Sequence, residues 1–101
     1  MELEIKTWEN EGVSTLELNG RLTTNSAPYL ERMVGSAITK QSDIVLDCAQ
    51  LQYVSSAGLR VFKKIYLWTN AHNKSFVLKN VNDMVMEVLN MVGLSKALTI
   101  E

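Results

Sequence analysis

Apolar and polar residues alternate at the start of the chain, which is typical of a half-buried β-strand. Leu3 and Ile5 are each flanked by charged residues. The segment 10–12 (Asn-Glu-Gly) has turn chemistry, and residues 13–18 alternate again, so they predict the returning strand of a hairpin. The Asn-Gly pair at 19–20 is expected to end that strand.

A helix and a buried strand are predicted next. After a polar lead, Pro28 suits the first turn of a helix. The residues 40–42 (Lys-Gln-Ser) are expected to end this helix, and the apolar run within 43–47 predicts a strand buried on both faces, followed by a short polar loop. The apolar face of the helix consists of Ala27, Leu30, Val34, Ala37 and Ile38.

A second helix is predicted over 57–71. Arg60, Lys63 and Lys64 fall on its polar side, and Leu67 lies on the same side as these three cations. The apolar face consists of Gly58, Val61, Phe62, Ile65 and Trp68, and is closed by Thr69 and His72.

The remainder of the chain predicts a short strand over 75–78, a third helix from 82–83 to Gly93, and a last strand over 98–100. Alternating strands and helices favour an α/β fold with right-handed crossovers, and the opening hairpin makes the sheet mixed. The third helix is expected to turn inward Val81, Met84, Val85, Val88, Leu89 and Val92.

Composition excludes several classes of function. The 101 residues include ten basic and eleven acidic side chains, a net charge of −1, which is unlike a protein that binds nucleic acid or a membrane surface. No apolar run approaches the roughly 18 residues of a membrane span, and the N-terminus does not resemble a signal peptide. A single cysteine fits a reducing compartment. We therefore expect one cytoplasmic domain.

No cluster of side chains predicts a catalytic, metal or cofactor site. Cys48 has no His or Cys at metal-binding or redox spacing, so we interpret it as a small buried apolar residue. His72, the single histidine, is expected to be structural or exposed. Asp47 is interpreted as a strand-end carboxylate that accepts loop N–H bonds, and the five methionines as core residues. Without a glycine-rich phosphate loop, paired carboxylates or a nucleophile elbow, the sequence does not predict an enzyme.

The serine pair Ser55-Ser56 precedes the second predicted helix. Serine is a preferred N-cap, worth about 1 kcal/mol over alanine, so capping alone explains either residue. The N-terminus of a helix also favours a phosphate, whether bound or covalently attached, because its backbone N–H groups and dipole attract negative charge. The residues by themselves leave both interpretations open.

Four segments resemble the STAS domain, the fold of bacterial anti-sigma factor antagonists. Residues 18–22 (Leu-Asn-Gly-Arg-Leu) are similar to its Leu-x-Gly-x-Leu step, 44–47 to its central strand, and 53–59 (Tyr-Val-Ser-Ser-Ala-Gly-Leu) to its signature loop. The pair Gly93-Leu94 resembles the Gly-Leu that follows its third helix. The resemblance covers residues 1–101 as a single STAS domain. It implies a mixed β-sheet of about four to five strands packed against three or more helices.

The resemblance also implies a phosphorylation switch. In the family, an anti-sigma factor that is also a serine kinase binds the unphosphorylated domain and phosphorylates one serine, which releases the partner and thereby regulates transcription. That serine corresponds to Ser56. Two positions depart from the family pattern: Ser55 and Thr23 stand where aspartate is usual. A serine phosphatase is a further expected partner, and a constitutive adaptor without a switch is the alternative function.

The polar stripe of the second helix is expected to continue the surface around the acceptor serine. Arg60 lies within a turn of Ser56, and Leu67 is two turns further along the same stripe. Leucine surrounded by cations matches the apolar centre and charged rim of a docking surface. The predicted partner-binding residues are Thr23, Thr24, Asn25, Ser55, Ser56, Ala57, Gly58, Arg60, Lys63 and Leu67.

Overall fold

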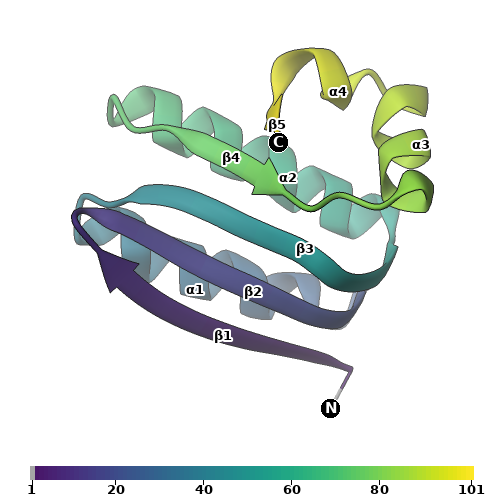
Figure 1. Cartoon of the computed structure of the whole chain (residues 1–101), viewed down its shortest axis with the longest axis horizontal. Helices are drawn as coiled ribbons and strands as arrows, with labels where there is room; N and C mark the ends of the chain where they lie inside the picture. Colours follow the sequence, from purple (N-terminus) through teal and green to yellow (C-terminus); the bar gives the residue numbers. More distant parts are fainter. Residues whose placement is uncertain (1) are drawn as a thin grey trace.

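The computed structural model describes residues 2–101, which form a five-stranded sheet and four helices. Strands are arranged in the order β1-β2-β3-β4-β5 (Figure 1). Strand β1 (Leu3–Asn10) pairs with β2 (Val13–Leu22) in antiparallel orientation, and β3 (Asp43–Val54), β4 (Phe76–Lys79) and β5 (Thr99–Ile100) extend the sheet in parallel. The prediction of a mixed α/β sheet is confirmed.

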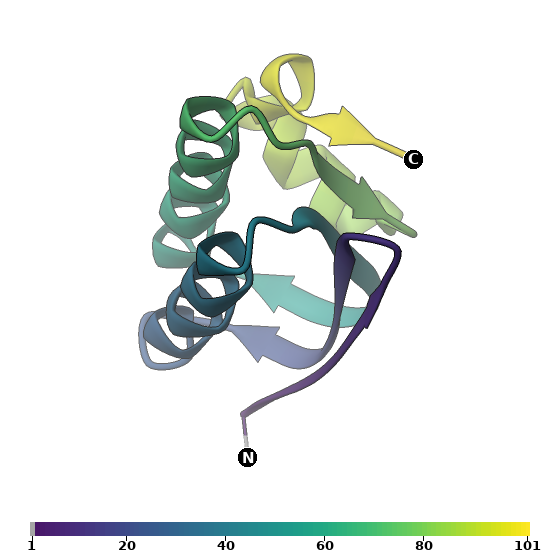
Figure 2. The same ribbon diagram turned by 90° about the vertical axis from the view of Figure 1, so that its left-hand side faces the viewer.

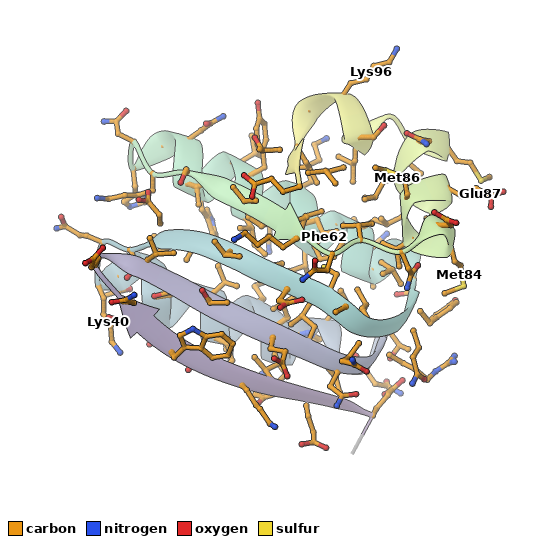
Figure 3. All side chains as sticks on the ribbon, in the orientation of Figure 1. Lys40, Phe62, Met84, Met86, Glu87 and Lys96 are labelled. Carbon is orange, nitrogen blue, oxygen red and sulfur yellow. The ribbon has the colours of Figure 1, made fainter. Side chains whose placement is uncertain are left out.

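Helices α1 (Ala27–Thr39) and α2 (Ser56–Ala71) lie side by side on one face of the sheet (Figure 2). The predicted apolar face of α1 is buried in full. In α2, Leu59 is buried in addition to the predicted face, whereas Trp68 is only partly buried and His72 is exposed. Phe62, labelled in Figure 3, has no exposed surface and belongs to the core between α2 and the sheet.

Strands β2 and β3 are longer than the sequence pattern predicts. β2 continues through Asn19 and Gly20. β3 continues from residue 47 to Val54, where the sequence pattern predicts a polar loop. The β2–β3 register shifts twice, and each time β3 contains one extra residue. At each extra residue, two consecutive side chains are exposed. Two consecutive outward-facing positions are typical of a loop, but here the strand continues through a β-bulge.

Helix α3 (Asp83–Met91) contradicts part of the predicted inward face. Met84 is 48% exposed and Val92, which ends the helix, is 54% exposed. Met91 is 78% exposed, so neither Met84 nor Met91 is a core residue, and Met1 lies outside the described residues. α3 packs on β3 and on the short helix α4 (Leu94–Ala97). A narrow apolar stripe is enough to cover this small contact area. Val85 and Leu89 form its buried part.

Candidate functional site

The carboxyl ends of β2 and β3 bring the two predicted polar loops together. Leu22 and Val54 are neighbours at the end of the β2–β3 ladder. Beyond them, the Ser55 N–H donates a hydrogen bond to the Leu22 carbonyl at 2.8 Å. The loop before α1 and the first turn of α2 are therefore fixed to each other by the backbone.

The two serines have different structural roles. Ser55 is the N-cap of α2, and its Oγ accepts a hydrogen bond from the Gly58 N–H at 3.3 Å. Ser56 is the first residue of the helix and is exposed. Because Ser55 caps the helix, capping does not account for Ser56, whose hydroxyl lies where the backbone N–H groups and the helix dipole favour negative charge.

Gly58 is buried and lies beneath the loop rather than on the predicted binding surface, which corrects that expectation. A Cβ atom at this position would lie 2.8 Å from the Leu22 side chain and 3.1 Å from that of Val54. These distances are shorter than normal contacts, so only glycine lets α2 approach the ends of both strands this closely. Gly58 thus positions Ser55 and Ser56 from a buried position.

A carboxylate from the start of the chain contacts the loop before α1, which the sequence pattern did not indicate. Thr23 Oγ1 donates a hydrogen bond to Glu2 Oε1 at 2.6 Å, and it accepts one from the Asn25 N–H at 3.2 Å. Ser26 Oγ is buried, accepts from the Thr23 N–H at 2.9 Å and donates to the Arg21 carbonyl at 2.8 Å. Glu2 thus places a carboxylate beside Thr23, one of the two positions where the resemblance leads us to expect aspartate.

Arg21 and Tyr53 form a cation–π pair next to the same loops. They are cross-strand neighbours, and the guanidinium carbon of Arg21 lies 4.6 Å from the centroid of the Tyr53 ring. Both side chains are exposed. An exposed pair of this kind is worth about 0.5–1 kcal/mol. The sequence did not reveal this contact, because the β-bulges determine which residue of β3 faces Arg21.

The outward side of α2 matches the predicted helix phase. Arg60, Lys63 and Lys64 are exposed, and Leu67 is 54% exposed among them. Thr24, Ala57, Arg60, Lys63 and Leu67 line one groove between α1 and α2. Thr23 and Asn25 lie outside this groove, although the Thr23 loop continues into it at Thr24.

Asp47 and Cys48 have structural roles. Asp47 Oδ1 accepts hydrogen bonds at 3.0 Å from the Ala49 N–H and from the Asn80 side-chain amide. Cys48 is buried, and its Sγ contacts the Leu46 carbonyl at 3.7 Å. Within residues 2–101, no three His, Cys, Asp or Glu side chains are grouped as a metal site requires.

Burial, with a smaller contribution from Asp47, raises the pKa of the Cys48 thiol to about 12. We therefore expect thiol reagents not to modify Cys48 at neutral pH unless denaturant is present.

The raised pKa of Cys48 also makes the stability of the domain depend on pH. The folded state binds the thiol proton more tightly than the unfolded state, so Cys48 contributes its full share to the free energy of unfolding below pH 9. This contribution is lost as the pH rises toward 12. Alkaline unfolding of wild type and Cys48→Ala measures this: the variant should lose less stability over that range, and identical pH dependence would contradict the assignment.

Comparison with known proteins agrees with the geometry of the fold. The chain is 29% identical over 102 residues to an anti-sigma F factor antagonist from Paenibacillus polymyxa, covering 99% of this chain and 87% of the relative. A crystal structure of a protein from Thermotoga maritima, described as a putative anti-sigma factor antagonist, superposes with a TM-score of 0.88 at 20% identity, over 95% of this chain and 84% of that one. The phosphorylated form of the Bacillus cell fate determinant SpoIIAA superposes with a TM-score of 0.75 at 15% identity, over 98% and 90%.

Two further findings concern the chain as a whole. None of the helices in the described part of the chain is long and apolar enough to cross a membrane. The family model of the STAS domain matches residues 4–101, which include every helix, both loops of the site and all of the strands except Leu3, the first residue of β1. The chain therefore belongs to the STAS domain family.

Proposed function

We propose that this protein is an anti-sigma factor antagonist whose binding is switched by phosphorylation of Ser56. The observation that carries the proposal is the division of roles between the serines: Ser55 caps α2, and Ser56 is exposed at its first residue. The similarity to an anti-sigma F factor antagonist supports the partner class. The protein acts as a binding module rather than an enzyme, in the cytoplasm, where its partner is an anti-sigma factor with serine kinase activity.

The structure gives a physical reason for a switch at this position. Phosphorylation adds a charge of about −1.5 to −2 and three acceptor oxygens. The backbone N–H groups in the first turn of α2 stabilise that charge within the domain, so the fold tolerates the modification. A partner surface in close contact with Ser56 has to bury the same charge. The complex is therefore weakened while the domain remains folded, and removal of the phosphate by a serine phosphatase restores binding.

The substitutions at Ser55 and Thr23 are compatible with this function. Ser55 supplies the N-cap that an aspartate would supply, since both residue types accept the hydrogen bond from the first turn. The Glu2 carboxylate accepts a hydrogen bond from the Thr23 hydroxyl. It therefore supplies a negative charge to the part of the surface where the family usually has the aspartate. The proposed partner-binding surface comprises the exposed or partly exposed residues Glu2, Thr23, Thr24, Asn25, Ser55, Ser56, Ala57, Arg60, Lys63 and Leu67.

Phosphorylation is tested with the anti-sigma factor kinases encoded in the source genome, each purified and incubated with ATP and this protein. We expect one of them to add a single phosphate, which mass spectrometry of proteolytic peptides assigns to Ser56. Ser55→Ala should still be phosphorylated while losing about 1 kcal/mol of stability with its cap, and Ser56→Ala should not be phosphorylated. Binding of an anti-sigma factor without any phosphate on Ser56 would favour the constitutive adaptor instead.

A further inference from the structure

A groove of about 500 Å³ lies between α1 and α2, and most of the residues that line it are exposed. Figure 2 shows the two helices side by side. The groove begins at Thr24, next to the loop that carries Thr23, and continues along α2 to Leu67. Its apolar lining includes Ala27 and Pro28 from the first turn of α1, and Ala57 and Val61 from α2.

Small side chains create this hollow. A small residue lies in the first turn of each helix, Ala27 in α1 and Ala57 in α2, and both line the groove, so the two first turns do not fill the space between them. Leu67 borders the other end of the groove and keeps more than half of its surface exposed. The groove therefore offers an apolar floor and one unburied leucine to a side chain from another molecule.

The rim of the groove is positively charged. Arg60, Lys63 and Lys64 border it from α2, and Glu31 borders it from α1. Lys64 Nζ lies 3.1 Å from Glu31 Oε1, whereas the salt bridges within residues 2–101 leave Arg60 and Lys63 without a carboxylate partner. The whole chain has a net charge of −1, so this cationic rim is a local feature. It attracts a segment that carries carboxylates.

From these observations we infer that the groove binds an acidic amphipathic helix of the partner protein. One or two apolar side chains of that helix fill the hollow above Ala27 and Ala57 and contact Leu67. Carboxylates on its flanks face Arg60 and Lys63. This inference rests on the proposed function for the identity of the partner, since the groove adjoins the Ser56 loop, but the chemistry of the occupant follows from the groove alone.

Synthetic peptides of about 18 residues, long enough to form a helix, test this chemistry. The first carries leucines on one face and glutamates on the flanks, the second has lysines in place of the glutamates, and the third has serines in place of the leucines. Binding to the full chain is followed by NMR shifts of backbone amides at concentrations up to about 1 mM. We expect the first peptide to shift amides of the first turn of α1 and of residues 57–67, and to bind at least about tenfold more tightly than the other two.

Variants of the chain make the test specific. The double variant Arg60→Glu/Lys63→Glu should weaken binding of the acidic peptide about tenfold or more, and Leu67→Ser should weaken it with little change in melting temperature. Lys96→Glu, a single charge reversal on α4 (Figure 3), serves as the control outside the groove and should leave binding unchanged. Equal binding of the acidic and basic peptides, or shifts confined to other surfaces, would overturn the inference.

The experiments also distinguish a failure of the groove inference from a failure of the proposed function. Light scattering measures whether the protein alone forms dimers. If it does, and if the dimer blocks the groove so that the peptide cannot bind, the occupant of the groove is a second copy of the chain and the inference is wrong. If the peptide binds as expected but no anti-sigma factor kinase phosphorylates Ser56, the groove chemistry holds and the proposed function fails. The phosphorylation assay and the peptide assay therefore give independent answers.

Discussion

Phosphorylation of Ser56 is expected to weaken the complex with the anti-sigma factor by a factor of about 30 or more. A phosphate places about −1.5 to −2 charges in a surface that contacts the partner closely. Burying a charge without its own partner typically costs 2–5 kcal/mol, and about 1.4 kcal/mol corresponds to a tenfold change in affinity. Titration calorimetry with the unmodified and the fully phosphorylated protein measures the difference. Equal dissociation constants for the two forms would rule out the switch.

Aspartate substitutions at Ser55 and Ser56 show whether partner binding depends on a negative charge at Ser56 itself or on any negative charge in this loop. Ser56→Asp introduces its carboxylate at the exposed first residue of α2 and should also weaken binding, although less than a phosphate. Ser55→Asp adds the same charge one residue earlier, where aspartate caps the helix as well as serine does. We expect Ser55→Asp to retain binding within about threefold, less than half of a 1.4 kcal/mol step. If both variants lost affinity equally, the effect would come from the charge of the loop rather than from Ser56.

Substituting Gly58 by alanine is expected to destabilise the domain, although alanine is the better helix former. The added Cβ would lie 2.8 Å from the Leu22 side chain and 3.1 Å from that of Val54, both of them buried, so either these side chains or the helix must shift within a packed core. Overpacking of this kind typically costs about 1–3 kcal/mol, which lowers the melting temperature of a domain of this size by roughly 4–8 °C per kcal/mol. Because Gly58 also determines where Ser56 lies, partner binding should weaken as well.

Gly35 provides the matched control. It lies within α1, and a Cβ added there meets no atom within 4 Å. Gly35→Ala should therefore stabilise the protein by about 0.5–1 kcal/mol through helix propensity alone. Thermal unfolding of the two variants measures the contrast, which is expected to have opposite signs. A stabilising Gly58→Ala would mean that α2 does not pack on the ends of β2 and β3 as described.

Local periodicity was sufficient to predict the sheet class and the phases of α1 and α2. All five apolar residues predicted for α1 are buried, and Leu67 is exposed as the phase of α2 requires. These helices pack on a broad sheet, so their burial follows the period of 3.6 residues. The periodicity failed for Met84 and Val92, because α3 packs mainly on β3 and on the short helix α4.

The parts of the site that depend on strand register could not be predicted from the sequence. The two β-bulges expose consecutive residues of β3, and this pattern is indistinguishable from a loop until the pairing with β2 is known. Three contacts depend on long-range pairing for the same reason: the Arg21–Tyr53 stack, the Thr23–Glu2 hydrogen bond and the packing of Gly58 on Leu22. The serine pair itself was visible, but the assignment of the cap to Ser55 required the backbone geometry of α2.

ATP-triggered dissociation of a preformed complex measures whether Ser56 is the residue at which phosphorylation releases the partner. The protein and its anti-sigma factor are purified together without ATP, ATP is added, and native mass spectrometry follows the complex and the phosphorylated free protein in time. We expect the wild-type complex to dissociate as phosphate appears on Ser56, while the Ser56→Ala complex stays intact. A wild-type complex that persists after Ser56 is phosphorylated, or a Ser56→Ala complex that dissociates equally fast, would contradict this expectation.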